Sequence, residues 1–463
     1  MGIFKDERLI KLVNLIQDSI RSTHFQDKVF LCGGCVRDSI LGLPIKDVDI
    51  AVNIPNGGIL FSTYMAMKQM CFVSGTNPLI FETYGTAKLQ LYKNEELKDL
   101  QIECVQTRKE QYKKESRNPE TVFGTIEEDA KRRDLTINAL YYDITNEKVI
   151  DFNGCGFADL SNKILRTPTD ADTTFTDDPL RILRVIKFST RLGWDIEKNT
   201  WLGMVKNASR LSIVSQERIT DEISKILLCD KPSVGIRKMY NCGVLSEVMQ
   251  DVYDMMQAYE SKNPMVTTFD HTMNVLDTVQ PYIENRLAAL FHDVGRIATD
   301  VFRNISPDQF SADIAASDLK KMKFPNSVIK SVETAIKYHR MFDKYSDGSL
   351  PLDKKIRKFV NLCGDDIGTT VDLMNANNLH VTYNKKKRQA LDILNRIEEL
   401  ESIDKMKNVK LPINGDDIIK EFKLKPSATI GILLECVKDA YFENPEISKD
   451  ECFEVVENKL RTL

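Results

Sequence analysis

The chain has 463 residues, of which 42% are hydrophobic and 29% are charged, and its formal net charge is −4. At about 150 residues per domain, this length predicts about three domains. The composition is typical of a globular protein with buried cores. The nearly balanced charge excludes a protein that binds nucleic acid through its overall charge, so any such surface has to be local.

Ten cysteines are scattered along the sequence, which shows no signal-peptide pattern. This predicts free thiols in a reducing compartment rather than a disulfide framework. No apolar run approaches the ~18 residues that a membrane-spanning helix needs. We therefore expect a cytoplasmic protein with no membrane contact.

The first predicted element is an amphipathic helix, with apolar residues at helical spacing at Leu9, Leu12, Val13, Ile16 and Ile20. From about residue 29 to 149, short β-branched or alternating runs predict strands separated by turns and helices, in "KVFLCGG", "VDIAVNI", "AKLQLYK" and "LQIECVQ". After Arg166 the strand patterns nearly vanish and helical periodicity continues. The predicted fold class is α+β, with a mixed-sheet head followed by an all-helical remainder.

A polar and highly charged stretch interrupts the head, from Gln106 to Gly124, and it contains Pro119. Such a composition predicts a flexible surface loop.

Two aspartates, Asp47 and Asp49, occupy alternate positions of a predicted strand. Residues i and i+2 of a strand project from the same face, so both carboxylates point together. Two like charges held close are costly unless a partner neutralises them, and Mg²⁺ prefers oxygen ligands and substrate phosphates. Two bridged metal ions can activate an attacking hydroxyl and stabilise a pyrophosphate leaving group. The alternative is a pair of solvated strand-end carboxylates.

Gly33 and Gly34 follow the strand "KVFL", where glycine lets the backbone approach phosphates without a Cβ. Arg37 then supplies a planar cation for phosphate oxygens. These residues and the aspartate pair together predict a nucleoside-triphosphate site. Glu103, in a neighbouring predicted strand, is the candidate for a third catalytic carboxylate, although a solvent-facing glutamate is equally compatible with the pattern. The motif Cys32-x-x-Cys35 has no second pair, so we expect both cysteines to be packing residues.

The motifs resemble those of class II tRNA nucleotidyltransferases, the CCA-adding enzymes of the polymerase-β superfamily. "GGCVRDSILGLPIKDVDIAV" resembles their first motif and "EEDAKRRDLTINALYYD" their second. "DDPLRILRVIKFSTRLGW" resembles the base-reading helix, "ERITDEISKIL" the helix that supports it, and "LPINGDDIIKEFKLKPSATIGILL" the C-terminal region of bacterial members. The resemblance covers nearly the whole chain in the order of the family.

The resemblance implies four parts. These are a nucleotidyltransferase head (1–165), a neck with the base-reading helices (166–230), a body with an HD-like helical domain (231–380) and a tRNA-binding tail (381–463). It also implies a two-metal Mg²⁺ site with Asp47, Asp49 and Glu103 as catalytic residues. Gly33, Gly34 and Arg37 belong to the implied nucleotide site.

The second motif contributes Arg133, Asp134 and Asn138 to the nucleotide site. Two adjacent arginines, Arg132 and Arg133, suit a triphosphate, and an aspartate can accept from ribose hydroxyls. The resemblance implies that this motif selects ribonucleotides.

Base reading is assigned to Asp178 and Arg181, which we expect to share a helix face at spacing i, i+3. One carboxylate and one guanidinium can pair with cytosine or adenine, and a wrong base leaves buried polar groups unpaired. The usual Glu-Asp pair of the family is Asp177-Asp178 here. Arg184 continues the basic stripe, as a nucleotide or primer contact or a solvated residue. Glu217, Arg218 and Glu222 are expected to form ion pairs that brace this helix.

His271, His292 and Asp293 resemble part of the metal site of an HD domain. Asn377 stands where the distant aspartate of that site belongs, and a neutral amide should weaken metal binding. Both a degenerate structural HD fold and a working phosphohydrolase with a second metal remain open.

The predicted function is template-independent addition of CCA to tRNA 3′ ends from CTP and ATP. One enzyme must accept every tRNA, so it would grip the acceptor and TΨC arms by backbone shape. In the family that the chain resembles, a loop at this place helps the switch from CTP to ATP. The resemblance therefore implies that the stretch at 106–124 favours full CCA addition over CC-only addition, but a CC- or A-only enzyme stays open.

Three other functions are alternatives to CCA addition. A poly(A) polymerase would carry a "GRRF"-like stretch that is missing here. An HD metal phosphohydrolase is disfavoured by Asn377. An RNA-binding protein that has lost catalysis is disfavoured by the intact Asp47, Asp49 and Asp178. The oligomeric state is not predicted.

Overall fold

The computed structural model describes residues 3–45, 47–68, 78–82, 85–92, 94–113, 116–255, 259–260, 263–298, 306–343, 353–380, 386–403 and 409–462. The chain divides into two compact units. The first comprises Met1–Ile226 with Val234–Glu247, and the second comprises Leu227–Ser233 with Val248–Leu463. A mixed-sheet head with a mostly helical remainder confirms the predicted fold class. The division into four parts stays a prediction.

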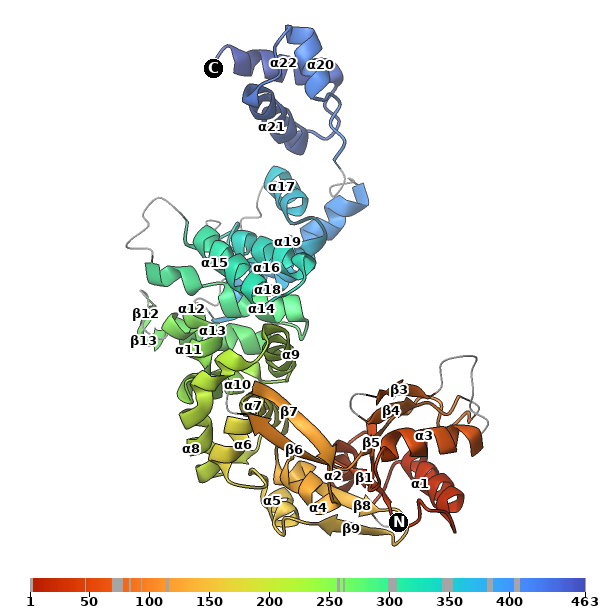
Figure 1. Cartoon of the computed structure of the whole chain (residues 1–463). Helices are drawn as coiled ribbons and strands as arrows, with labels where there is room; N and C mark the ends of the chain where they lie inside the picture. The colour runs from red at the N-terminus through yellow and green to blue at the C-terminus, as the bar shows by residue number, and fades with distance from the viewer. Residues whose placement is uncertain are drawn as a thin grey trace. The chain divides into compact units, whose positions relative to one another are not determined.

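The first unit is built on a seven-stranded mixed sheet (Figure 1). Its spatial order is β3 (Leu79–Phe81), β4 (Thr86–Leu89), β5 (Gln101–Gln106), β2 (Asp47–Val52), β1 (Val29–Cys32), β8 (Leu140–Asp143) and β9 (Lys148–Asp151). β2 and β5 pair in parallel, whereas β1 pairs antiparallel with both β2 and β8. The four strands expected from the sequence are therefore present, in one sheet.

The two faces of the central strands have different roles because side chains alternate along a strand. Cys32, Ala51 and Tyr141 lie on one face, in a hydrophobic cluster with Ile126 and Ala130. The other face carries fully buried aliphatic residues such as Val48 and Ile50. Helix α3 (Gly57–Lys68) packs against β2, β4 and β5, and α1 (Glu7–Ile20), which the sequence predicted, packs against α3 (Figure 1).

A β-hairpin, formed by β6 (Arg108–Lys113) and β7 (Ser116–Phe123), replaces the flexible loop expected here. That expectation was wrong because the hairpin base is pinned by its neighbours. The N–H of Arg108 donates to Asp129 Oδ1 at 3.1 Å, and that of Gly124 donates to the carbonyl of Thr107 at 3.3 Å. The side chains of residues 111–120, including Pro119, lie outside the described residues.

The rest of the first unit is helical and supports the sheet. Helix α4 begins with a capping box in which Thr125 and Glu128 exchange side-chain and backbone hydrogen bonds. Helix α7 buries an apolar stripe and ends at Gly193, which adopts a left-handed conformation with φ of 68°. The helices are α2 (Gly34–Leu41), α4 (Ile126–Lys131), α5 (Gly156–Asn162), α6 (Ala171–Asp177), α7 (Leu180–Leu192), α8 (Lys198–Asn207) and α9 (Gln216–Leu227). A two-residue parallel ladder joins β10 (Ile164–Leu165) to β11 (Asp195–Ile196).

The second unit is almost entirely helical, apart from β12 (Tyr259–Glu260) and β13 (Asn263–Thr267). Its helices include α13 (Thr268–Thr278), α14 (Ile283–Phe291), α15 (Pro307–Lys321), α16 (Asn326–Tyr338), α17 (Asp353–Cys363), α18 (Ile367–His380) and α19 (Lys386–Ile403), followed by α20 (Gly415–Phe422), α21 (Ala428–Glu443) and α22 (Lys449–Leu460). Between α9 and β12 along the chain lie α10 (Pro232–Asn241), α11 (Val244–Val248) and α12 (Gln250–Asp254). Within the described part of the chain, every helix is too short or too polar to cross a membrane.

Candidate active site

Three carboxylates meet at one end of the parallel strand pair. Asp49 of β2 is the register partner of Glu103 of β5, and Asp47 is the partner of Gln101. Register partners and residues at i+2 project from the same face of a sheet, so Asp47, Asp49 and Glu103 share one face. All three line a single cavity of about 1810 Å³. The sequence predicted this grouping, including the third carboxylate from a neighbouring strand.

The electrostatics of this group favour a bound cation. The pKa of Asp49 is raised, mainly by burial and further by the charges of Glu103 and Asp47, while Arg133 opposes the shift. A raised carboxyl pKa means that burial and the neighbouring negative charges disfavour the ionised form of Asp49. A hard divalent cation coordinated by carboxylate oxygens would supply that charge. The donor set therefore fits the expected Mg²⁺ site.

Gly33 forms the turn between β1 and α2, with φ of 71°. A Cβ at this position would lie 3.0 Å from Arg133 Nη1 and 3.4 Å from Asp49 Oδ2. Both the backbone conformation and the close approach therefore require glycine. The N–H of Gly33 donates to the carbonyl of Leu140 at 3.3 Å, and the helix α2 begins at the next residue, Gly34. Phosphate binding at this turn stays a prediction.

Arg37 lines the cavity but its guanidinium already has partners. Only 3% of the residue is exposed. It pairs with Asp38 at 2.7 Å, donates to Asn138 Oδ1, and lies over the ring of Phe188 at 5.0 Å. Phosphate binding by Arg37 stays a prediction, and the structure gives it a second task of holding Asn138.

Asp134 and Asn138 form a link between the sheet and α7. The two oxygens of Asp134 accept from Asn138 Nδ2 at 3.0 Å and from Arg184 Nε at 2.7 Å. Burial alone would raise the pKa of Asp134, but Arg184 and Asn138 outweigh it and hold the pKa well below its usual range. Three predicted nucleotide-binding residues therefore bind one another across two elements.

Asp178 and Arg181 line the same cavity, but they do not share a helix face as expected. α6 ends at Asp177, Pro179 caps α7, and the helix begins at Leu180, so Asp178 sits in extended backbone between two helices. The expectation failed because the proline breaks the helix that the i, i+3 spacing assumed. Asp178 Oδ1 accepts from the N–H of Leu180 at 3.2 Å, which fixes the carboxylate.

Helix α9 provides the supporting ion pairs expected for this region. Glu222 pairs with Lys187 of α7 at 2.7 Å, and Arg218 lies 3.7 Å from Asp178 Oδ2. Glu217 lies in the first turn of α9. Burial, reinforced by the like charge of Arg184, lowers the pKa of Lys187.

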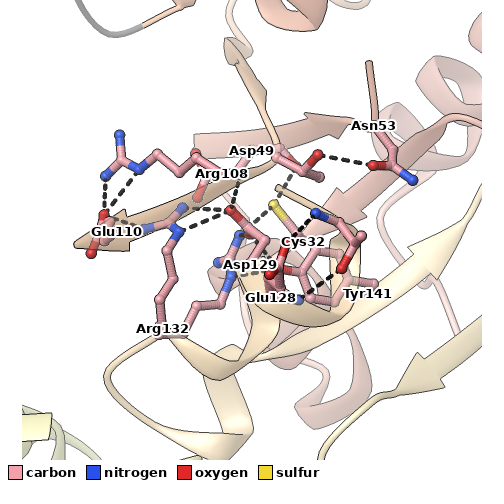
Figure 2. Close-up of polar contacts among 12 residues, drawn as sticks. Cys32, Asp49, Asn53, Arg108, Glu110, Glu128, Asp129, Arg132 and Tyr141 are labelled. Carbon is pink, nitrogen blue, oxygen red and sulfur yellow. Dashed lines mark hydrogen bonds and ion pairs between the residues drawn. The ribbon is translucent and has the colours of Figure 1, made fainter. Parts of the chain in front are cut away.

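Glu110 is a residue that sequence reasoning missed. Its side chain is only 4% exposed, and it contacts Arg108 and Arg132, each at 2.9 Å (Figure 2). It also contacts Arg181 at 3.5 Å. One carboxylate of the hairpin thus connects Arg132 of the second motif with Arg181, the arginine that the sequence predicts to read the base. Glu110 could not be recognised as a site residue from the sequence, because the surrounding stretch has the composition of a solvated loop.

The cavity as a whole is locally basic. Ten basic and seven acidic side chains line it, although the chain as a whole is slightly acidic. The basic set is Arg37, Arg108, Arg132, Arg133, Lys163, Arg181, Arg184, Lys187, Arg191 and Arg218. Such a surface suits a polyanionic substrate such as a triphosphate or an RNA end.

A second cluster lies in the other unit, where His271, His292 and Asp293 come together as the sequence suggested. His271 Nε2 lies 3.4 Å from His292 Nε2 and 3.7 Å from Asp293 Oδ2, and His292 Nε2 lies 3.3 Å from Asp293 Oδ2. Asn377 Oδ1 lies 2.9 Å from His271 Nε2, so the amide does stand beside the cluster.

Comparisons with known proteins point in one direction. Residues 29–166 match the family described as poly A polymerase head domain, and residues 193–255 match the probable RNA- and SrmB-binding site of polymerase A. The chain is 27% identical to the mitochondrial CCA tRNA nucleotidyltransferase of Candida glabrata, over 98% of this chain and 96% of the relative. It is 28% identical to the CCA-adding enzyme of Streptococcus thermophilus, over 94% and 93% of the two chains.

Solved structures show the same fold. The CCA-adding enzyme of Bacillus stearothermophilus in complex with CTP matches with a TM-score of 0.66 and 19% identity, over 98% of both chains. A Thermotoga maritima CCA-adding enzyme complexed with tRNA matches with a TM-score of 0.60 and 20% identity, over 98% of this chain and 96% of the other.

Proposed function

Since the chain belongs to the family of CCA-adding tRNA nucleotidyltransferases, we propose that it builds the CCA end of tRNA from CTP and ATP without a template. The observation that carries this proposal is the group of Asp47, Asp49 and Glu103 on one sheet face, inside a basic cavity. The 3′-hydroxyl of the tRNA would attack the α-phosphate of the nucleotide, and pyrophosphate would leave. Mg²⁺ held by these carboxylates would lower the pKa of the hydroxyl and stabilise the leaving group.

Two side chains of the cavity would recognise the base of the incoming nucleotide. Asp178 and Arg181 would pair with the base edge, so that cytosine and adenine fit whereas guanine and uracil leave unpaired polar groups. Arg181 contacts Glu110 in this structure, and Asp178 has Arg218 nearby. When a base binds, Arg181 and Asp178 would therefore replace these protein partners with atoms of the base, and neither side chain starts as an isolated charge.

The proposal is tested with a tRNA that ends at the discriminator base, incubated with Mg²⁺ and CTP, ATP or both. Growth by three nucleotides with both, and by two with CTP alone, is the expected result. Asp49→Asn should abolish extension, whereas Glu96→Gln, a surface change with a 59% exposed side chain, should not. Long A tails would identify a poly(A) polymerase, and growth that stops at two nucleotides with both substrates would identify a CC-adding enzyme. Full CCA addition is favoured because the chain contains the stretch from Gln106 to Gly124, which the resemblance to the family associates with full CCA addition.

The metal and the cellular compartment are further parts of the proposal. Three oxygen ligands favour Mg²⁺ over a transition metal, and extension should be supported by Mg²⁺ and lost with chelator. We also propose a cytoplasmic location, supported by nine free cysteines among the described residues. Fractionation of cells that express the full chain would test the location, because the Candida glabrata relative is mitochondrial by name.

We further propose that His271, His292 and Asp293 bind a transition-metal ion. Ligands about 2.1 Å from a tetrahedral metal lie about 3.4 Å from one another, and the three distances here are 3.3, 3.4 and 3.7 Å. Asp293 Oδ2 is buried without a hydrogen-bond partner within the described chain. His292 Nδ1 contacts the carbonyl of Ala289 at 2.8 Å, which leaves the lone pair of Nε2 for a ligand.

The surroundings favour a structural ion over a hydrolytic one. The three residues are at most 6% exposed, which leaves little access for a substrate. Arg296 and Arg340 both pair with Asp293 Oδ1, at 3.0 and 3.2 Å, and they hold the carboxylate in place. Burial and the neighbouring His292 lower the pKa of His271 to about 4, so its imidazole is neutral at pH 7.

Elemental analysis of the purified protein tests this site. About one equivalent of a metal such as zinc or manganese is expected in the wild type, and it should be lost in His292→Ala but kept in His24→Ala, which changes an exposed histidine. Equal metal content in all three proteins would contradict the site. Hydrolysis of a 2′,3′-cyclic phosphate that depends on His292 would support a phosphohydrolase instead of a structural ion.

A further inference from the structure

The guanidinium of Arg133 donates to four different partners. Its Nε donates to the hydroxyl of Tyr141 at 2.8 Å, and its Nη1 donates to the carbonyl of Asn138 at 3.3 Å. Its Nη2 donates to Cys32 Sγ at 3.1 Å and to Asp129 Oδ2 at 3.2 Å. A guanidinium has five N–H donors, so four of them are satisfied by described residues and one remains, on Nη1.

The remaining donor lies on the side of the guanidinium that faces Gly33 and Asp49. Nη1 is the nitrogen that a Cβ at Gly33 would approach to 3.0 Å, and Asp49 Oδ2 is the next nearest atom to that same point, at 3.4 Å. Arg133 therefore presents one N–H, rather than a two-pronged fork, at the place where Asp49 would hold the reacting phosphate. The adjacent Arg132 contributes nothing there, because it is paired with Asp129 at 2.7 Å and Glu110 at 2.9 Å.

Tyr141 is the central restraint on this arginine. Its hydroxyl accepts from Arg133 and donates to Asp129 Oδ2 at 2.5 Å, and its ring lies 5.0 Å below the guanidinium carbon. Figure 2 shows that Tyr141, Asp129 and Cys32 lie close together. Tyr141 and Asp129 are fully buried, so neither side chain has room to take another position.

Cys32 connects the same arginine to the carboxylate strand. It is the register partner of Asp49, and its thiol contacts the carbonyl of Asp49 at 3.6 Å while it accepts from Arg133. Burial raises the pKa of this thiol to about 12, so it stays protonated and can donate to that carbonyl. The cysteine is more than the packing residue expected from the sequence.

We propose that Tyr141, assisted by Cys32, is a positioning residue that restrains Arg133 so that a single Nη1–H faces the α-phosphate or the attacking hydroxyl beside Asp49. This rests on the proposed nucleotidyl transfer. A donor fixed before the reaction stabilises charge that develops in the transition state without reorganisation. Loss of the restraint should lower kcat more than it raises KM, because the contact matters most where the charge develops.

A double-mutant cycle tests the proposal. CMP incorporation is measured for the wild type, Tyr141→Phe, Arg133→Ala and the double variant, with kcat and KM determined separately. Tyr141→Phe keeps the ring and removes only the hydroxyl, and we expect kcat to fall about 10-fold with KM changed less than about three-fold, as for loss of a hydrogen bond to a charged group. In the Arg133→Ala background, the same change should alter kcat by less than about two-fold.

Tyr142→Phe is the matched control. Tyr142 is the next residue of β8, points to the other face, and its buried hydroxyl has no hydrogen-bond partner among the described residues. This variant should retain wild-type kcat. Cys32→Ala should lower kcat by part of the amount expected for Tyr141→Phe. In the Arg133→Ala background, Cys32→Ala should leave kcat unchanged.

The outcomes separate this inference from the proposed function. If the wild type and Tyr142→Phe extend tRNA but Tyr141→Phe retains full kcat, the positioning role is wrong and the function stands. Equal losses for Tyr141→Phe with and without Arg133 would show that Tyr141 acts through the fold alone. If the wild type itself adds no nucleotide, the proposed function fails first.

Discussion

Asp49 and Glu103 are register partners on the parallel strands β2 and β5, which places their carboxylates side by side on one sheet face. We propose that Glu103 is a ligand that tunes metal affinity beside Asp49. The charges of Asp47, Glu103 and Arg133 all act on Asp49, which makes Asp49 the central carboxylate of the group.

Replacing Glu103 should therefore weaken the metal site without destroying it. We expect Glu103→Gln to lose about 10- to 100-fold in activity at low Mg²⁺, since one carboxylate ligand is removed, and to recover partly as Mg²⁺ is raised. Asp49→Asn should not recover. A Mg²⁺ titration of CMP incorporation measures this, with Glu96→Gln as the surface control. An unchanged Mg²⁺ dependence for Glu103→Gln would show that Glu103 is only a strand residue.

Gly33 should tolerate no side chain, for two separable reasons. Its φ of 71° strains any L-residue, and a Cβ would crowd Arg133 and Asp49. Gly33→Ala should lower activity by at least about 100-fold, because misplacement of groups by about 1 Å has costs of that order. Gly154→Ala is the control, since Gly154 has φ of 73° with no atom within 4 Å of its Cβ position. If both variants lose activity equally, backbone strain explains the whole effect.

Glu110 should affect which base is added rather than whether addition occurs. Glu110→Gln removes the charge that binds Arg108, Arg132 and Arg181, so Arg181 would lose one of its restraints. We expect misincorporation of UMP or GMP relative to CMP to rise about 10-fold, since wrong bases are rejected through fixed polar partners. Competition assays with mixed nucleotides measure the ratio. Glu95→Gln, with an 83% exposed side chain, is the control, and an unchanged ratio would remove Glu110 from base selection.

Asp129 should contribute stability that depends on pH. Burial alone would raise the pKa of Asp129, but Arg132 and Arg133 outweigh it and the folded-state pKa lies well below its usual range. A carboxyl group with a lowered folded pKa stabilises the protein above its unfolded pKa, about 3.9, and that stability is lost as the pH falls below it. Asp129→Asn should therefore cost about 3–5 kcal/mol at pH 7.

The difference between Asp129→Asn and the wild type should shrink as the pH falls from about 4 to 2, measured by urea unfolding at each pH. Asp18→Asn, which changes a 76% exposed side chain, should show no such trend. A difference that stays constant with pH would mean that shape, rather than charge, makes Asp129 necessary.

The sequence predicted the residues on strands better than the contacts of the arginines. Alternation in β2 was enough to group Asp47 with Asp49, and a neighbouring strand pattern was enough to suggest Glu103. The contacts of Arg37 with Asn138, of Arg133 with Cys32 and of Arg181 with Glu110 could not be predicted, because each joins residues that are distant along the chain. Glu110 and Tyr141 illustrate the limit, since one lies in a stretch with loop-like composition and the other in an ordinary buried strand.

Helix boundaries show a second limit. The spacing of Asp178 and Arg181 suggested one helix, but Pro179 begins a new one and leaves Asp178 outside it. The HD-like residues did meet as their pattern suggested. Their burial and the two arginines on Asp293 are tertiary features, and no local pattern carries them.

The parallel pairing of β2 with β5 also determines what a folding error would produce. Because side chains alternate, a slip of one residue between these strands would turn Glu103 or Asp49 to the opposite, aliphatic face. Such a molecule would lack one of the three carboxylates. It would be catalytically inactive rather than active with a higher rate of misincorporation. For this protein, the catalytically active fraction of a preparation should therefore equal the fraction of molecules in which β2 and β5 have paired in the correct register. A partly misfolded preparation should have a lower activity per milligram of protein but an unchanged misincorporation ratio.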